Sequence, residues 1–146
     1  MSQAPSKSLR TMMVFANNMH VALYRASRGK FANKIANLPI LLLTTRGRKS
    51  GKLHTHPVVY LKDGPDYLIS ASAGGMDWHP GYYFNIKNTP EVKIQIGDQR
   101  MDARALIVNG EERTQLYEKF KAASSNFVKY EKGTRRVIPV IRLTPQ

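Results

Sequence analysis

Three features are missing from this sequence, and each absence narrows what the protein can be. There is no cysteine among its 146 residues, which excludes disulfide frameworks, thiolate catalysis and cysteine-bound zinc. No apolar run is long enough to cross a membrane, and the first residues carry no secretory apolar segment. No Asp or Glu occurs before Asp63. The first two absences favour a cytoplasmic protein, and the third points to its partners.

The missing acidic residues make the charge strongly asymmetric. Residues 1–62 contain 11 of the 23 Lys and Arg residues, whereas all 10 Asp and Glu residues follow them. Most of the net charge of +13 therefore lies in the first half of the chain. Such a half favours a polyanionic partner: nucleic acid, anionic lipid, or a small ligand with phosphate and carboxylate groups. Charge alone does not separate these classes from a basic surface that only aids solubility.

The hydrophobic pattern predicts one N-terminal helix followed by mostly β-structure. Apolar residues between Ser8 and Ala26 recur every three or four positions, which is typical of an amphipathic helix. Residues 1–6 before it are expected to form a loose tail. Alternating or continuous apolar runs bounded by turn residues predict strands at 40–45, 53–62, 67–72, 92–96, 100–108 and 137–143. Shorter helices are expected at 80–87 and 110–123.

These elements specify a mainly β, α+β chain. The early strands are joined by short connections, which excludes a doubly wound parallel sheet because parallel strands need helical crossovers. We expect a small antiparallel barrel or sandwich of about six strands, with an N-terminal helix and one or two C-terminal helices. We also expect a single domain, residues 1–146. Residues 1–37 would form the tail, helix and basic connection, and residues 38–146 the barrel and later helices.

The clearest binding motif is a basic turn between two expected strands, GRKSG, from Gly47 to Gly51. Its glycines let the backbone turn tightly and approach a ligand. Arg48 and Lys49 offer cationic donors and Ser50 a hydroxyl, which suits a phosphate or carboxylate ligand. The spacing matches neither a dinucleotide fingerprint nor a P-loop. A plain hairpin turn with solvated lysines is the alternative interpretation.

A second segment, residues 70–85, interrupts the β-pattern with glycine, proline and aromatic residues. Gly74 and Gly75 expose backbone, and four flat side chains with polar tips follow: Trp78, His79, Tyr82 and Tyr83. Aromatic residues in such a loop are typical of a place where a planar molecule docks, although some rings can simply cap a barrel. Together with the basic turn, the loop predicts a ligand that is anionic at one end and planar at the other.

The histidines and serines invite two other interpretations. His54 and His56 lie two apart on an expected strand and so share one face. With His79 they could supply three metal ligands, but no neighbouring carboxylate is available to orient them. We therefore expect no metal site. A serine-hydrolase triad has no support either, because Ser70 and Ser72 lack a nucleophile-elbow context.

Five segments occur in a fixed order along the chain: LLLTTRGRKSGKLHTHPVVYL, SASAGG, HPGYYFNIKNTPEVKIQI, GEER and TRRVIPVIRL. Together they resemble the deazaflavin-dependent nitroreductase family, split β-barrel proteins that bind coenzyme F420. The resemblance extends from residue 8 to residue 143, nearly the whole chain. It implies a split β-barrel and a coenzyme F420-dependent oxidoreductase. The implied reaction is hydride transfer between the deazaflavin and a small unsaturated or quinone-like substrate.

The resemblance also implies which residues bind the coenzyme. In the family the GRKSG turn holds the coenzyme's phosphate- and carboxylate-bearing tail, a role that carries over to Arg48, Lys49 and Ser50. The implied wall around the deazaflavin is His54, Thr55, His56, Pro57, Val58, Val59, Ser70, Ala71, Ser72, Ala73, Gly81, Tyr82, Tyr83, Phe84 and Asn85. The segment SSNFVKYEKGTRR resembles the family's lid over the substrate. We therefore expect Phe127 and Tyr130 to contact the substrate, with Tyr130 as the candidate catalytic proton donor.

Three positions depart from the family. This chain has His54 where relatives commonly have Arg, Ala73 where they have Lys, and Ser124 where nitro-reducing relatives have Tyr. The lost cations leave FMN as an alternative cofactor, and a non-catalytic carrier of a cofactor or lipid as an alternative function. Arg46 and Lys52, which flank the turn, are candidates to replace the missing charge. Ser124 argues against reduction of nitroimidazoles.

The remaining expectations concern partners. We expect a small-molecule substrate and no nucleic acid, because the aromatic residues cluster in one loop instead of alternating along a strand. A nucleic-acid-binding module is therefore the most distant alternative. The basic amphipathic helix favours peripheral contact with a membrane surface. A monomer and a homodimer are equally compatible with the sequence.

Overall fold

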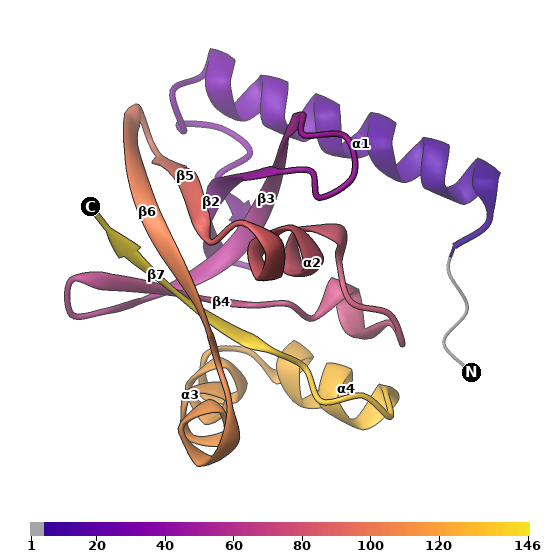
Figure 1. Cartoon of the computed structure of the whole chain (residues 1–146), viewed down its shortest axis with the longest axis vertical. Coiled ribbons are helices and arrows are strands. Elements are labelled where there is room, and N and C mark those ends of the chain that lie inside the picture. The colour runs from indigo at the N-terminus through magenta and orange to yellow at the C-terminus, as the bar shows by residue number, and fades with distance from the viewer. Residues whose placement is uncertain (1–4) are drawn as a thin grey trace.

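A long N-terminal helix, a β-barrel and three shorter helices make up the structure, a computed structural model that describes residues 5–146 (Figure 1). Residues 1–4 of the expected tail lie outside the described residues. The helices are α1 (Lys7–Ala26), α2 (Gly81–Asn88), α3 (Gly110–Ala123) and α4 (Ser125–Gly133). Within the described part of the chain, no helix is both long and apolar enough to span a membrane.

Within residues 5–146, six antiparallel strands close into a barrel, and a seventh lies outside it. The strands are β1 (Lys34–Ile35), β2 (Leu38–Arg46), β3 (Leu53–Asp63), β4 (Asp66–Ser70), β5 (Glu91–Ile96), β6 (Gln99–Val108) and β7 (Val140–Pro145). Their order is β1-β2-β3-β4-β7-β6-β5, and a pairing of β2 with β5 closes the barrel. Leu42 of β2 accordingly pairs with Pro57 of β3 on one side and with Gln95 of β5 on the other. The expected α+β split barrel is confirmed.

The continuous apolar run of β2 reflects two covered faces. Leu41 and Leu43 point into the barrel core. Because side chains alternate along a strand, Ile40 and Leu42 point outward, where they pack under Val21 and Tyr24 of α1. A strand between a barrel core and a helix has no solvent face, so it shows no polar alternation.

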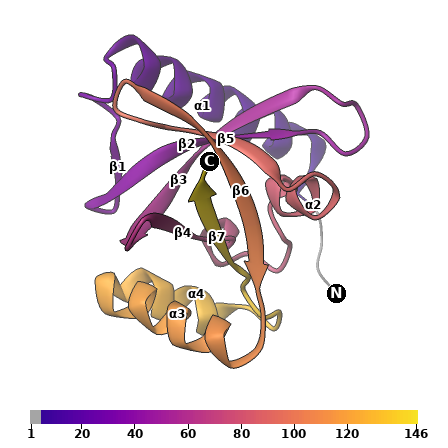
Figure 2. The same ribbon diagram turned by 60° about the vertical axis from the view of Figure 1, so that its left-hand side comes forward.

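Only the C-terminal half of α1 is anchored in the core. Ser6 caps the helix by accepting a hydrogen bond from the Leu9 amide at 3.3 Å. Val21 and Tyr24 are its buried side chains, and the Tyr24 hydroxyl accepts the Gly97 amide at 2.8 Å. The helix thus runs along one end of the barrel, while α3 and α4 cover the opposite end (Figure 2).

The two C-terminal helices form one packed unit. The Tyr117 hydroxyl of α3 donates to the Phe127 carbonyl of α4 at 2.7 Å, and burial raises the pKa of Tyr117 to about 12. Both residues belong to a cluster that also contains Phe120 and Val140. The expectation of one or two C-terminal helices is therefore met by two.

Two strands are shorter at one end than expected, and one short strand was not expected; each difference has a local reason. The last strand begins at Val140 rather than Val137, because Pro139 has no amide to donate to a ladder. Strand β4 ends at Ser70 rather than Ser72, because the chain then turns through three consecutive positive φ angles, at residues 73–75. Strand β1 was not expected, since two residues are too short to show a period.

Candidate functional site

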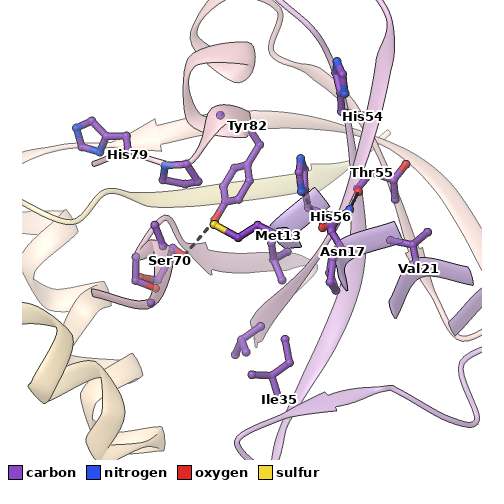
Figure 3. Close-up of a pocket in the computed structure, with 18 of the residues that line it drawn as sticks. Met13, Asn17, Val21, Ile35, His54, Thr55, His56, Ser70, His79 and Tyr82 are labelled. Carbon is purple, nitrogen blue, oxygen red and sulfur yellow. Dashed lines mark hydrogen bonds between the residues drawn. The ribbon is translucent and has the colours of Figure 1, made fainter. Parts of the chain in front are cut away.

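A pocket of ≈ 1250 Å³ lies between α1, β3, the segments that follow β4, and α4 (Figure 3). It brings together most of the residues nominated as cofactor contacts. These are Arg48, His54, Thr55, His56, Pro57, Val58, Val59, Ser70, Ser72, Ala73, Gly81, Tyr82 and Phe84. Phe127 and Tyr130, nominated as substrate contacts, line the same pocket.

Five nominated cofactor residues do not line it: Lys49, Ser50, Ala71, Tyr83 and Asn85. Lys49 is exposed on the turn, and the Ser50 hydroxyl accepts the Lys52 amide at 3.1 Å within the turn itself. Ala71 is fully buried in the barrel core. The alternation of side chains along the chain thus separates it from its pocket-facing neighbours Ser70 and Ser72.

A buried asparagine holds the basic turn against α2. Asn85 Oδ1 accepts the Arg48 amide at 3.1 Å, and Asn85 Nδ2 donates to Thr45 Oγ1 at 3.0 Å. Thr45 is fully buried and Asn85 only 8% exposed. Breaking these bonds would therefore leave buried polar groups without hydrogen-bond partners, because water does not reach them. Asn85 therefore positions Arg48 and does not itself face the ligand space.

The turn directs the Arg48 side chain to the pocket rim. The Gly47 amide donates to the Lys52 carbonyl at 2.7 Å, and the Gly51 amide to the Gly47 carbonyl at 2.9 Å. Gly51 has φ +72°, which a glycine adopts without strain. The Arg48 guanidinium lies 4.6 Å from the centre of the Phe84 ring, and both residues line the pocket.

Two further cations come from α1 and were not nominated from the sequence. Arg10 and Arg25 line the pocket, and Arg25 Nη2 donates to Thr55 Oγ1 at 3.4 Å. Arg46 and Lys52, the expected replacements for the missing charge, do not line it. The helical period offers the signal, because Arg10, Asn17 and Arg25 fall on one face of α1. Among the described lining residues there are three arginines and no Asp or Glu.

Asn17 ties α1 to β3 at the centre of the pocket. Its Nδ2 donates to the Thr55 carbonyl at 2.8 Å, and its Oδ1 lies 3.0 Å from His56 Nδ1. His56 is half-buried beside the Tyr82 ring, with a ring-centre distance of 6.0 Å. Burial, and secondarily the nearby His54, lowers the pKa of His56.

Tyr82 and Ser70 form the adjoining wall. The Tyr82 hydroxyl donates to the Ser70 carbonyl at 3.4 Å (dashed in Figure 3). Burial raises the pKa of Tyr82, so this hydroxyl stays protonated. Ser70 Oγ is buried and has no hydrogen-bond partner among residues 5–146, although Ser70 lines the pocket. A bound polar ligand would give this hydroxyl the partner that the protein does not supply.

The far wall is a tight turn packed against α4. Ala73, Gly74 and Gly75 all have positive φ. A side chain at Gly75 would place its Cβ 2.8 Å from the Tyr130 ring, so glycine permits this contact. Ser124 lines the pocket beside this wall, and its hydroxyl caps α4 by accepting the Asn126 amide at 3.2 Å.

Arg136, which was not nominated, fastens this wall from behind. Its Nη2 donates to the carbonyls of Ala71 and Ser72 at 3.1 and 2.8 Å, and its Nε to the Met76 carbonyl at 2.9 Å. Its Nη1 lies 3.0 Å from His79 Nδ1. Burial, followed by the charges of Arg136 and Lys87, lowers the pKa of His79.

The neighbouring aromatic residues complete this wall. The His79 and Tyr83 rings are in contact, with centres 4.3 Å apart and planes inclined by 31°. Tyr83 therefore supports His79, although it does not line the pocket itself. His79 and Trp78 do line it.

The site therefore combines three cations, two on α1 and one on the basic turn, with a strand and aromatic residues. Arg10, Arg25 and Arg48 suit the phosphate and carboxylates of a coenzyme tail. The unpartnered Ser70 hydroxyl suits a polar ring atom. The residues present thus fit a ligand with an anionic tail and a planar ring.

Comparisons with known proteins agree with this geometry. The profile of a family described as F420H(2)-dependent quinone reductase matches residues 16–145. A protein named F420H(2)-dependent quinone reductase from Mycobacterium tuberculosis (strain ATCC 25618 / H37Rv) is 35% identical over 130 residues, covering 86% of this chain and 87% of that protein.

Two solved structures are similar in both fold and sequence. One, described as an F420-H2 dependent reductase (FDR-A), has a TM-score of 0.66 and 38% identity, covering 72% of this chain and 93% of that chain. Another, described as a domain-swapped dimer, has a TM-score of 0.68 and 32% identity, covering 86% of this chain and 96% of that chain. The predicted resemblance is confirmed for the fold and for F420 dependence, with quinone reductase in place of nitroreductase. The chain belongs to the F420H2-dependent quinone reductase family.

Proposed function

We propose that this protein transfers hydride from reduced coenzyme F420 to a quinone-like small molecule bound in the pocket described above. The observation that carries the proposal is the lining of that pocket. Three arginines and no acidic residue face a strand and aromatic rings. This arrangement suits an anionic planar coenzyme, and membership of the family supports the same chemistry.

The proposed roles of the side chains follow from their positions. Arg10, Arg25 and Arg48 bind the acidic tail of the coenzyme, and residues 54–59 lie along its ring. The coenzyme supplies the hydride when bound, so the protein needs to orient it, bind the substrate and exclude water. Phe127 and Tyr130, from α4, contact the substrate on the opposite side of the pocket.

Tyr130 is proposed as the proton donor to the reduced substrate. It lines the pocket, and its ring lies 5.6 Å from that of Phe127, the other expected substrate contact. Tyr130→Phe should therefore slow turnover about a hundredfold or more, the usual contribution of a positioned acid, while leaving the Kd of coenzyme F420 unchanged. Tyr117→Phe is the matched control, because the Tyr117 hydroxyl bonds within the helix pair and not in the pocket. Equal turnover in Tyr130→Phe and the unmodified protein would remove Tyr130 from the reaction.

The proposed activity can be tested with cofactors in parallel. Anaerobic titrations would compare coenzyme F420 with FMN, and stopped-flow absorbance would follow oxidation of each reduced cofactor by menadione. We expect tight binding of coenzyme F420 alone, and oxidation of F420H2 by menadione that is rapid only when the protein is present. Binding of FMN alone would support the FMN alternative. Binding of F420H2 without oxidation by menadione or another quinone would identify a carrier instead.

We also propose that α1 places the pocket entrance at an anionic membrane surface, where lipophilic quinones dissolve. The apolar side chains of α1 that are exposed are Leu9, Met12, Met13, Val14, Phe15, Met19 and Leu23. Met13 and Val14 also line the pocket, so the exposed apolar surface continues into the site. The absence of acidic residues from the first 62 positions favours an anionic lipid surface over a neutral one.

Vesicle co-sedimentation tests this contact. We expect binding to phosphatidylglycerol vesicles at low salt, weaker binding at high salt, and little binding to phosphatidylcholine vesicles. Phe15→Asp should abolish binding, whereas Val137→Asp, at an apolar side chain exposed elsewhere, should not. Sedimentation velocity on the same variants tests the competing explanation, a homodimer through α1. No binding at low salt would exclude the membrane contact.

A further inference from the structure

We propose that His56 is a hydrogen-bond acceptor of this pocket, fixed by Asn17 as the tautomer that leaves Nε2 free for a proton-bearing atom of the bound ligand. The inference rests on the proposed function only for the identity of that ligand. Two ligands of the proposed reaction carry such an atom: the deazaflavin, through a ring N–H, and the reduced quinone, through a hydroxyl.

The Thr55 carbonyl fixes the orientation of the Asn17 side-chain amide. The Thr55 carbonyl lies 2.8 Å from Asn17 Nδ2. A carbonyl oxygen only accepts, so Asn17 must present its NH2 group to Thr55. Because Thr55 is part of β3, the strand backbone itself sets the amide, and Asn17 Oδ1 has to face the other way.

The Asn17 amide in turn fixes the tautomer of His56. Asn17 Oδ1 lies 3.0 Å from His56 Nδ1. The amide oxygen also only accepts, so the proton of this hydrogen bond must belong to Nδ1. A neutral His56 then carries its proton on Nδ1 and a lone pair on Nε2.

His56 is held neutral by its surroundings. The charged side chains that line the pocket with His56 are Arg10, Arg25 and Arg48, all of them cationic. No carboxylate of the described residues lines the pocket and could stabilise a protonated imidazole. Burial acts in the same direction, and the pKa of His56 is lowered.

His56 Nε2 is accessible to a ligand in the pocket. Nε2 has no hydrogen-bond partner among residues 5–146, and it is not one of the fully buried side-chain atoms that lack a partner. His56 lines the pocket, with Tyr82 on one side and Asn17 on the other (Figure 3). A ligand that presents an N–H or O–H group to His56 Nε2 can donate a hydrogen bond to it. A ligand that presents another acceptor at this point cannot, and it binds less tightly.

The tautomer can be measured without any ligand, so its test is independent of the proposed function. Long-range proton–nitrogen correlation NMR at about pH 8, where histidines are neutral, distinguishes Nδ1–H from Nε2–H. His20 and His79 provide opposite controls in the same spectrum. His20 Nε2 faces the Ala32 carbonyl at 2.7 Å, and His79 Nδ1 faces the Arg136 guanidinium, so both must carry the proton on Nε2. We expect His56 alone among these three to show Nδ1–H.

Substitution of Asn17 tests the positioning. Asn17→Ala should release the Nδ1–H preference of His56 and leave the spectra of His20 and His79 unchanged. Asn18→Ala, next to it on α1 and also lining the pocket, is the matched control and should leave His56 as it is. An Nε2–H signal for His56 in the unmodified protein would overturn the proposal at once.

Ligand binding tests the acceptor role and separates the two sources. The probes are oxidised coenzyme F420, and menadiol compared with its dimethyl ether, which lacks the hydroxyl protons. The ligand that donates to His56 should move the Nε2 resonance and bind about fivefold more weakly to His56→Leu. His56→Gln, whose amide oxygen can accept, should recover most of that loss.

If menadiol donates to His56, it should bind more tightly than its dimethyl ether to the unmodified protein and no more tightly than the ether to His56→Leu. If the coenzyme is the partner, its affinity alone should fall. An Nε2 resonance that moves with neither probe, or equal affinities of all three proteins for both, would overturn the acceptor role. The NMR spectrum of the unmodified protein tests the His56 tautomer even if a variant fails to fold.

Discussion

Arg48 and Lys49 are neighbours in the basic turn, yet only one of them faces the ligand space. Asn85 holds the Arg48 amide, and the Arg48 guanidinium lies over the Phe84 ring at the pocket rim. Lys49 is exposed and does not line the pocket. Two adjacent cations of the same motif are therefore expected to contribute unequally.

A pair of alanine substitutions measures this difference. Arg48→Ala should weaken coenzyme F420 binding about tenfold or more, because a charge-assisted contact to the acidic tail is lost. Lys49→Ala should change the affinity by less than about twofold, as expected for a solvated charge. Fluorescence titration of the coenzyme gives both values. Equal losses for the two variants would contradict the placement of the tail at Arg48.

At the scale of elements, the pocket depends on how the loop after β4 is held to the segment after α4. Arg136 makes three hydrogen bonds to carbonyls of residues 71–76 and one contact with His79. The Thr134 hydroxyl adds a bond to Asp77 at 2.8 Å. Arg136 thus provides most of the side-chain hydrogen bonds between the wall of the pocket and the C-terminal segment.

Removing the Arg136 side chain should destabilise both the wall of the pocket and the C-terminal segment. Arg136→Ala is expected to lower the free energy of unfolding by about 2–3 kcal/mol, because several carbonyls lose their donor at once. Arg135→Ala, one residue earlier and exposed, should change it by less than about 0.5 kcal/mol. Urea titration followed by circular dichroism gives both numbers. A stability of Arg136→Ala within that smaller range would show that the carbonyls find other donors.

The turn at residues 73–75 gives a second prediction at this scale. Gly74 and Gly75 both have positive φ, +63° and +81°, but only Gly75 is crowded, with a Cβ position 2.8 Å from the Tyr130 ring. Gly74→Ala should therefore cost about 1–2 kcal/mol of stability from backbone strain alone.

Gly75→Ala should cost about 1–3 kcal/mol more, because Tyr130 must also move. It should in addition lower turnover, while Gly74→Ala leaves turnover near that of the unmodified protein. Thermal unfolding and steady-state rates would measure the two effects. Identical stabilities of the two variants would contradict the close packing of the turn on α4.

At the scale of the whole molecule, acid should destabilise the fold through its histidines. The pKa values of His56 and His79 are lowered in the folded protein. The unfolded chain therefore binds more protons than the folded one as the pH falls toward and below the ordinary histidine value, and stability must decrease in that range. Asp63, whose pKa is lowered by Arg142 and then Lys119, contributes a similar loss only at much lower pH.

Urea titrations between about pH 7.5 and about pH 5 test this sign. The free energy of unfolding should fall with pH, and the double variant His56→Gln, His79→Gln should show a flatter dependence. Gln at position 79 keeps a side-chain acceptor for the Arg136 guanidinium but does not titrate. Stability that stays constant or rises on acidification would contradict the lowered pKa values.

The secondary structure and fold class were largely predictable because their signals are local. The helical period of residues 8–26 and the alternation of Val92, Ile94 and Ile96 each depend on a few neighbouring residues. The boundaries at Ser70 and Val140 moved because positive φ angles and a proline override the apolar pattern. Strand β1 was missed because two residues carry no period.

The sequence by itself determined the type of site: a basic turn, an aromatic loop, and an absence of acidic residues through the first 62 positions. Tertiary structure alone decided which side chains share the pocket. Arg10 and Arg25 reach it only because α1 docks on β3, and Arg136 reaches the loop only because β7 pairs with β4. Helical and strand periods and turns are set by residues that are close together in the sequence. Contacts between distant segments depend on how the barrel closes.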